Sequence, residues 1–217
     1  MKKLFDPNQP FFKFMSHWAD VFLINLCFML SCIPIVTIGP ALIALYTITM
    51  RMVRGDFNQT AQDYWAAFRE NLKQGILAWL LALVVGALLL LNLYYSYQWQ
   101  SIDPSRPHMV MLCIAIVVLA LYAAIMLFLF PTMAQFSASF GQQLQNAMLF
   151  SIINLPKTLC AGVLTVLPVW LASLSETCFT GVVVAVFAGG FVLLNYLNSH
   201  LFVAAFDAYI KRIESDN

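Results

Sequence analysis

Charged side chains are scarce in this sequence. Asp, Glu, Lys and Arg make up 10% of its 217 residues, against roughly 25% in an average soluble domain. None of them occurs in segments 21–50, 74–102, 107–156, 158–175 or 177–206. A water-soluble protein of this length needs more polar surface, which excludes a soluble enzyme. The net charge of +1 also lacks the basic balance typical of a nucleic-acid-binding protein.

Motifs that would carry chemistry are missing as well. The sequence has no Gly-x-x-x-x-Gly-Lys-[Ser/Thr] loop for a nucleotide phosphate, no Cys-x-x-Cys pair, and only isolated histidines. Ionisable residues inside a membrane usually mark proton or ion pathways. Here Asp20, Glu176 and Asp207 lie only near the ends of apolar runs. We therefore expect no enzyme, no catalytic residues, no metal and no cofactor.

Apolar residues dominate what is present, at 62% of the chain. A bilayer core about 30 Å thick requires roughly 20 apolar residues in a crossing helix. A membrane β-barrel would instead alternate polar and apolar residues, whereas runs 77–91 and 111–130 are apolar on all sides. The sequence predicts an all-α, polytopic integral membrane protein that forms a single membrane domain over residues 1–217.

The basic residues predict the sidedness, because Lys and Arg concentrate in cytoplasmic loops. Three lysines precede the first apolar run, and four basic residues follow it between positions 51 and 73. Both groups are cytoplasmic only if residues 16–54 fold back, and Pro34, Gly39 and Pro40 supply the break. Each arm has about 16 helical residues, roughly 24 Å. The hairpin is therefore either transmembrane or re-entrant, and both readings stay open.

Six helices with cytoplasmic N- and C-termini follow from this reading. The short hairpin supplies the first two. Residues 75–131 hold helices 3 and 4, at about 75–97 and 109–130, and residues 158–206 hold helices 5 and 6, at about 158–172 and 179–203. A cytoplasmic amphipathic helix (57–74), a second cytoplasmic segment (132–157) and a cytoplasmic tail (207–217) complete the chain. Ten of the eleven Lys and Arg then lie inside, and Arg106 lies outside.

Three groups of residues are candidates for function. A broken helix exposes backbone polar groups of the kind that hold ligands in transporters, although a tight turn explains the same residues, Pro34, Thr37, Gly39 and Pro40. Polar residues inside the bilayer either join helices by hydrogen bonds or line a solute path, and the candidates are Asn25, Asn92 and Asn195.

The third group lies on the amphipathic segment, where Thr60 and Asp63 have the spacing of a helix N-cap. Apolar residues recur there at helical spacing. We expect them to anchor a partner protein, with basic residues at the rim of the contact. The docking residues would be Tyr64, Trp65, Phe68, Arg69 and Lys73.

Segment 30–41 reads Leu-Ser-Cys-Ile-Pro-Ile-Val-Thr-Ile-Gly-Pro-Ala. It resembles the Leu-Pro-Ile-Val-Thr-Ile-Gly-Pro-Ala core of the YesL family of bacterial membrane proteins, with Ile33 where that family usually has Leu. The pattern Tyr64-x-x-x-Phe68-x-x-Asn71-x-x-Gln74 is similar to the family's cytoplasmic segment. The resemblance implies a multi-pass protein of the bacterial cytoplasmic membrane. Genes of that family often neighbour carbohydrate ABC importers, which implies an accessory role in sugar uptake and no site residues.

We therefore expect an accessory or regulatory membrane protein associated with carbohydrate ABC-type uptake. Its partners would be the lipid bilayer and subunits of the ABC transporter, and no nucleic acid. The alternative is an uncoupled oligomeric channel or facilitator for a small polar solute. In that reading the chain forms a homo-oligomer, and the three asparagines line the path.

Overall fold

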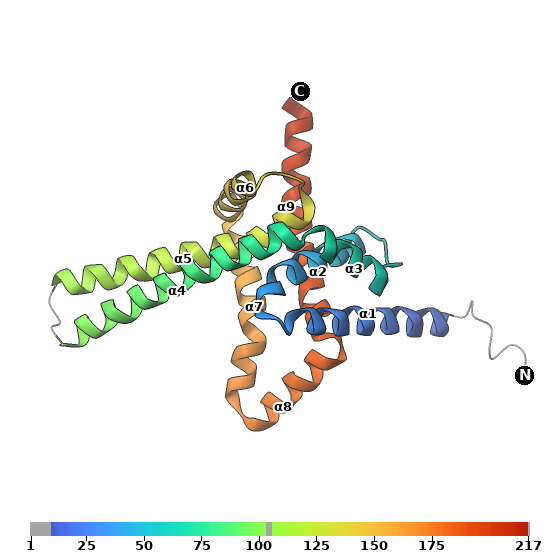
Figure 1. The fold of residues 1–217 in the computed structure, drawn as a ribbon, viewed down its shortest axis with the longest axis horizontal. Helices are drawn as coiled ribbons and strands as arrows, with labels where there is room; N and C mark the ends of the chain where they lie inside the picture. Colours follow the sequence, from blue (N-terminus) through green and yellow to red (C-terminus); the bar gives the residue numbers. More distant parts are fainter. Residues whose placement is uncertain (1–9, 103–105, 217) are drawn as a thin grey trace, which may run out of the picture.

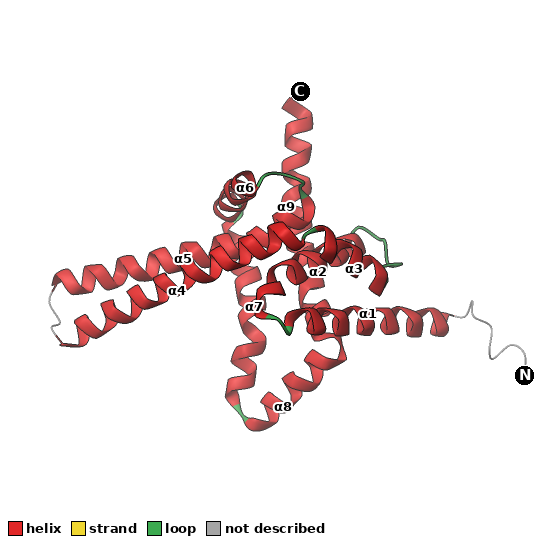
Figure 2. Ribbon diagram, in the orientation of Figure 1, coloured by secondary structure: helices red, strands yellow, loops and turns green. Residues whose placement is uncertain are grey.

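The computed structural model describes the backbone of residues 10–102 and 106–216 and the side chains of residues 17–102 and 106–211. Every regular element in this part of the chain is helical, as Figure 2 shows. The all-α class is therefore confirmed. Helices suit a lipid environment because each one satisfies its backbone hydrogen bonds within its own segment.

The first apolar run folds back on itself, as its prolines predict. Helix α1 (Pro10–Cys32) ends just before Pro34, the 3-10 turn η2 (Ile35–Thr37) follows, and helix α2 (Ile38–Val53) leads back. Pro34 has no N–H and its ring blocks a preceding helical turn, so α1 stops there. Pro40 is tolerated in the first turn of α2, where backbone N–H groups have no intrahelical partner.

The amphipathic segment is shorter than the sequence suggests. Helix α3 (Ala61–Glu70) begins directly after Thr60, and Thr60 and Asp63 form the expected capping box. The Asp63 carboxylate accepts from the backbone N–H of Thr60 at 2.9 Å, and the Thr60 hydroxyl accepts from that of Asp63 at 3.4 Å. The chain turns at Asn71, so Lys73 belongs to the next helix, α4 (Leu72–Ile102).

Helices α4 and α5 (Arg106–Gln135) pack side by side as a long hairpin (Figure 1). They have 31 and 30 residues, and at 1.5 Å per residue each extends roughly 45 Å. That length reaches beyond the hydrocarbon core into both headgroup regions, which is why both helices exceed their apolar runs. Helix α6 (Phe140–Ile153) follows within the segment expected at 132–157.

The last part of the chain differs most from expectation. Helix α7 (Leu155–Leu174) is close to the predicted helix 5. The single helix expected over 179–203 is wrong, because the chain forms helix α8 (Glu176–Ala185), a π-helical turn η3 (Val186–Gly190) and helix α9 (Phe191–Asp216). Gly189 has a φ of 124°, which interrupts the helix. Helix α9 also takes in most of the expected tail.

Helix α2 lies at the centre of the molecule. It packs against α1, α3, α4, α5 and α9, and Ala41, Ile43, Leu45 and Ile48 are fully buried. The α4–α5 hairpin extends from this centre in one direction, whereas α7 and α8 extend in another (Figure 1). Edge-to-face contacts of Phe128, Phe202 and Phe206 join α5 to α9 beside it.

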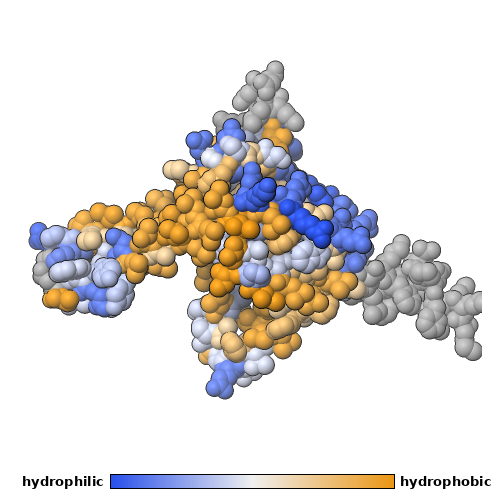
Figure 3. Space-filling view, viewed as in Figure 1, coloured by the Kyte–Doolittle hydropathy of each residue, from blue (hydrophilic) through white to orange (hydrophobic). Residues whose placement is uncertain are grey.

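The surface of the outlying helices is apolar. Five segments of the described chain are long and apolar enough to cross a membrane: Ile35–Val53, Leu72–Ile102, Arg106–Gln135, Leu155–Leu174 and Glu176–Lys211. Most of their side chains outside α2 are exposed, and Figure 3 shows the hydrophobic surface interrupted by hydrophilic residues mainly at the far ends and over α3. Exposed apolar area on this scale belongs in lipid. The chain is a multi-pass membrane protein.

Candidate functional site

Two apolar runs are interrupted by a helix break, the first at Pro34–Pro40 and the second at Val186–Gly190. These breaks and the surfaces next to them are the candidate sites. At the first break, the Thr37 hydroxyl donates to the carbonyl oxygens of Ser31 (2.7 Å) and Pro34 (2.8 Å). The indole Nε1 of Trp79 on α4 donates to the carbonyl oxygen of Ile35 at 2.8 Å. Three carbonyl oxygens at the break therefore have side-chain donors within the chain, with the Thr37 hydroxyl hydrogen shared between two of them, which suits a lipid environment.

Two glycines close this break against α4. A Cβ atom built on Gly39 would lie 2.3 Å from the carbonyl oxygen of Gly75 and 2.6 Å from Cβ of Trp79. One built on Gly75 would lie 2.7 Å from the backbone nitrogen of Pro40. Backbone therefore packs directly on backbone, and only glycine allows this approach. The structure brings Pro34, Thr37, Gly39 and Pro40 together as a sealed turn.

The second break was not expected from the sequence as a site. At the π-helical turn η3, an asparagine from α1 donates to two backbone carbonyl oxygens. Asn25 Nδ2 donates to the carbonyl oxygen of Val186 at 2.8 Å and to that of Phe187 at 3.4 Å. Asn25 is fully buried. Its role is to join helices through a hydrogen bond to the π-helical turn.

A cavity of about 610 Å³ lies beside the second break. Its walls come from α1, from the end of α2, from the loop before α3 and from the π-helical turn with the start of α9. The cavity is almost entirely apolar, and it is lined by residues including Trp18, Val21, Met52, Phe57, Gly189 and Tyr196. The pair Gly189-Gly190 is the sequence signal that could have indicated it, because glycines in a helix permit either close packing or a break.

The three candidate asparagines are not brought together. Asn25 lies at the π-helical turn, and Asn195 is buried on α9, where its Nδ2 donates to the carbonyl oxygen of Phe191 at 3.1 Å. Asn92 is exposed on α4, where it borders a shallow depression between α4 and α5. They do not line a common cavity in the described part of the chain, so this geometry lends no support to a path made of all three.

A buried polar contact that the sequence does not single out joins α2 to α9. The Thr49 and Ser199 hydroxyls lie 2.8 Å apart, and both side chains are fully buried. At the neighbouring position, Asn198 Nδ2 donates to the Thr165 hydroxyl of α7 at 3.4 Å. These bonds join three helices in a setting where hydroxyl and amide groups need internal partners. Thr49 gives no sequence signal because threonine is common in transmembrane helices.

The aromatic residues of α3 point into the molecule. Tyr64 is fully buried and Phe68 is 8% exposed, and both pack with α1 and α2. The prediction that they anchor a partner needs correction, because intramolecular packing already uses these rings. Trp65 is half-buried against Phe68, at 5.3 Å between ring centroids. Apolar residues at helical spacing on a short helix are compatible with packing on the core of the same chain as well as with docking of a partner.

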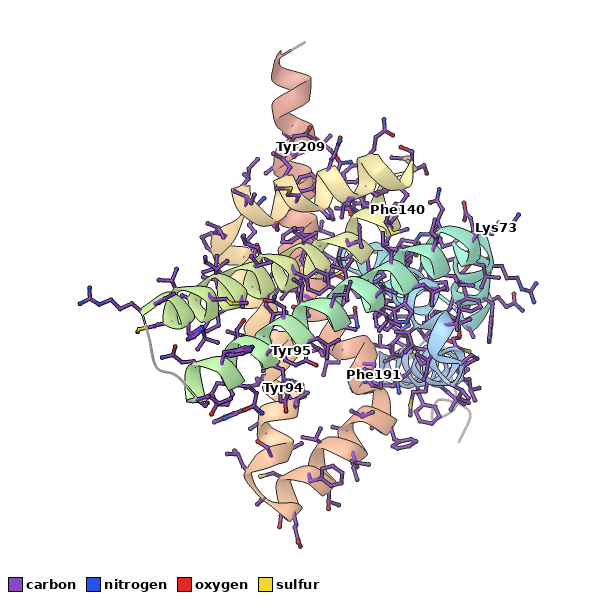
Figure 4. All side chains as sticks on the ribbon, turned by 60° about the vertical axis from the view of Figure 1, so that its left-hand side comes forward. Lys73, Tyr94, Tyr95, Phe140, Phe191 and Tyr209 are labelled. Atoms are coloured by element: carbon purple, nitrogen blue, oxygen red, sulfur yellow. The ribbon has the colours of Figure 1, made fainter. Side chains whose placement is uncertain are left out.

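Arg69 and Lys73, the two basic residues among the predicted docking residues, are exposed. Figure 4 shows Lys73 at the edge of the molecule, directed away from it. Together with the loop between α5 and α6 they border a polar groove of about 1000 Å³. Its other polar walls include Gln74, Ser137, Ser139 and Gln142. Hydrogen bonds from the side chain and backbone of Thr60 hold the pKa of nearby Asp63 below its usual value.

Comparison with known proteins gives one assignment. No curated protein and no solved structure matches the chain. The matched family segment contains the first helix break, α3 and the glycine contact between α2 and α4, and it ends within α4, before the second break. Residues 21–93 match the model of the family described as "Protein of unknown function, DUF624".

Proposed function

We propose that this chain is an accessory membrane protein that docks a partner protein on the polar groove between α3–α4 and the α5–α6 loop. The observation that carries the proposal is the exposed pair Arg69 and Lys73 at the rim of that groove. The aromatic side of α3 is packed inward, so α3 is held rigidly while its charged end is presented outward. A preorganised charged rim favours recognition and orientation of a partner.

The partner class comes from the resemblance to the YesL family, which implies a carbohydrate ABC-type importer in the bacterial cytoplasmic membrane. Rims of interfaces are polar, and oppositely charged partners steer one another into register. Arg69 and Lys73 favour an acidic patch on the cytoplasmic side of such an importer. In this proposal the chain itself neither catalyses a reaction nor conducts the sugar.

The proposed orientation places both termini, α3 and α6 in the cytoplasm. The far ends of the α4–α5 and α7–α8 hairpins both lie away from α3 in Figure 1, in different directions. The α1–α2 turn contacts Gly75 and Trp79, and six residues separate Lys73 from Trp79, roughly 9 Å at 1.5 Å each. Ile102, at the other end of α4, is roughly 35 Å further. This contact favours a re-entrant hairpin over a crossing one.

Labelling of single thiols with an impermeant maleimide tests the orientation, in a background without the five native cysteines. On intact cells Ser101→Cys should react, whereas Ser16→Cys and Asn58→Cys should react only after the membrane is opened. Ile33→Cys, at the exposed apolar turn, should stay unreactive in both conditions if it lies in lipid. Reaction of Ile33→Cys on intact cells would show that the hairpin crosses the bilayer.

Co-purification in a mild detergent tests the docking proposal. Mass spectrometry should recover importer subunits with the tagged wild-type chain, and the double substitution Arg69→Glu and Lys73→Glu should lower that recovery about tenfold, equivalent to 1.4 kcal/mol. Arg106→Glu, an exposed arginine at the far end of the α4–α5 hairpin, is the matched control. Equal recovery with all three chains contradicts the proposal. Sugar flux into proteoliposomes that contain this chain alone would favour the channel alternative instead.

A further inference from the structure

The cavity beside the second helix break exists because the residues on one side of it are small. Ala185, Ala188, Gly189 and Gly190 provide one wall, and at Gly189 a φ of 124° makes any larger residue unfavourable. Val21 of α1 faces this wall, with Cγ1 3.4 Å from the Cβ position of Gly189. The result is a hollow on a helix pair that otherwise has the length and hydropathy of a membrane span.

The position of the cavity suits one end at the membrane interface and one end in hydrocarbon. His17 and Phe57 stack at one end, with ring centroids 6.4 Å apart, and Phe57 belongs to the polar loop between α2 and α3. The other end is the π-helical turn, which begins ten residues after Glu176 within the 36-residue apolar span Glu176–Lys211. Trp18, next to His17, also lines the cavity, and tryptophan is enriched at the headgroup level.

The cavity is continuous with the surface that faces lipid. Leu193 lines the cavity and is 55% exposed, and the same elements carry Val184, Phe187 and Leu197, each at least 45% exposed. A cavity with such an apolar lining does not hold water stably, but it does accept apolar ligands. The mouth of the cavity opens to lipid hydrocarbon. An acyl chain can therefore enter it directly from the bilayer, without passing through water.

The geometry points to a binding site for one acyl chain of a bilayer phospholipid, held between α1 and the π-helical turn with its headgroup beside His17 and Phe57. This inference concerns a different surface from the docking groove and does not depend on it. About 610 Å³ is a typical volume for a small-ligand site. A partner helix about 10 Å across fills roughly 400 Å³ per turn, so the cavity takes little more than one turn and a second protein chain fits poorly.

Retention of lipid through purification tests the site. The protein is solubilised with 1-palmitoyl-2-oleoyl phosphatidylethanolamine present, and native mass spectrometry counts the phospholipids that stay bound. We expect one retained molecule per wild-type chain. Ala188→Leu or Ala185→Leu, which put a side chain into the cavity from exposed positions, should lower its occupancy at least tenfold. Ala204→Leu, an exposed alanine of α9 away from the cavity, should leave it unchanged.

Two results of that experiment overturn the inference: no phospholipid retained by the wild-type chain, or equal retention by the alanine variants and the control. If the variants fail to fold, photo-crosslinking of the wild-type chain tests whether an acyl chain occupies the cavity. Vesicles of phosphatidylethanolamine that carry a diazirine on one acyl chain should label residues 17–25 and 185–196 several-fold more than the exposed face of α5. Even labelling of both surfaces contradicts a specific site.

A second copy of the chain is the competing occupant. In a background without native cysteines, Ala188→Cys should give monomers on oxidation in the membrane, because lipid fills the cavity. Disulfide-linked dimers through this position would show that a second copy of the chain, and not an acyl chain, covers the cavity. That result would overturn the inference.

Discussion

The two helix breaks of this protein solve the same physical problem in opposite ways. The break at Pro34–Pro40 seals itself: Thr37 satisfies two carbonyl oxygens, Trp79 a third, and Gly39 and Gly75 bring backbone into contact with backbone. The break at Val186–Gly190 receives hydrogen bonds from Asn25 of α1, and a cavity remains between α1 and the same turn. The proline-rich break is thus the structural one, and the glycine break carries the candidate ligand site.

The difference comes from where the packing partners lie. The first break faces the start of α4, which provides a glycine and a tryptophan at adjacent turns of the helix, so that Gly39 packs on backbone and the Ile35 carbonyl oxygen has a donor. The second break faces α1 with small residues, Ala185, Ala188, Gly189 and Gly190, which leave a gap between the two elements. A gap that no side chain fills loses dispersion contacts, and a ligand can restore them.

The largest expected effect is at the sealed break. Gly39→Ala places a methyl group against backbone atoms of Gly75 and the Trp79 Cβ, which cannot move without separating α2 from α4. We expect a loss of about 3 kcal/mol of stability or more, measured by thermal unfolding in detergent. Gly181→Ala is the control, since nothing lies within 4 Å of its Cβ position and alanine favours the helix. A Gly39→Ala chain as stable as wild type would show that this contact is loose.

Asn25→Leu tests the second break. It leaves the Val186 carbonyl oxygen without its 2.8 Å hydrogen bond in a buried setting, and an unsatisfied buried acceptor costs about 1–3 kcal/mol. The melting temperature should fall clearly, and Asn92→Leu, on an exposed position of α4, should change it little. Equal effects at both positions would mean that Asn25 does not stabilise the turn.

Trp79→Phe should have a smaller effect at the first break. The ring stays in place beside Phe130, while the hydrogen bond to the Ile35 carbonyl oxygen is lost, at a cost of about 1 kcal/mol. Trp170→Phe, at an exposed position of α7, controls for the general loss of an indole. The comparison of unfolding midpoints isolates the bond, and an identical shift in both variants would assign no stability to it.

The smallest effect is the pH dependence of the α3 cap. The pKa of Asp63 is lowered in the folded state by hydrogen bonds from Thr60, so the cap stabilises the fold above the unfolded-state value and loses this contribution as pH falls below about 4. Asp63→Asn should remove that dependence. Asn25→Leu and Trp79→Phe should keep it, because amide and indole groups do not titrate there. Thermal unfolding between pH 3 and 7 measures the slopes.

Residue chemistry alone predicts the features that depend on neighbours in the chain. The apolar runs, the reversal at Pro34–Pro40 and the Thr60–Asp63 cap are each local, and the structure contains all three. A proline removes its own N–H and a capping box joins residues three apart, so the sequence itself determines where helices start and stop in these places.

Tertiary structure decided the remaining features, because the residues on a helix face do not determine which surface packs against it. The spacing of Tyr64 and Phe68 fits a partner or the chain's own core, and only the packing of α3 on α1 and α2 shows that the core uses them. Gly189-Gly190 fits close packing or a break, and only the approach of α1, with Asn25 donating to Val186, makes the break stable. Contacts between residues 161 positions apart carry no local pattern, which is why the cavity was not visible in the sequence.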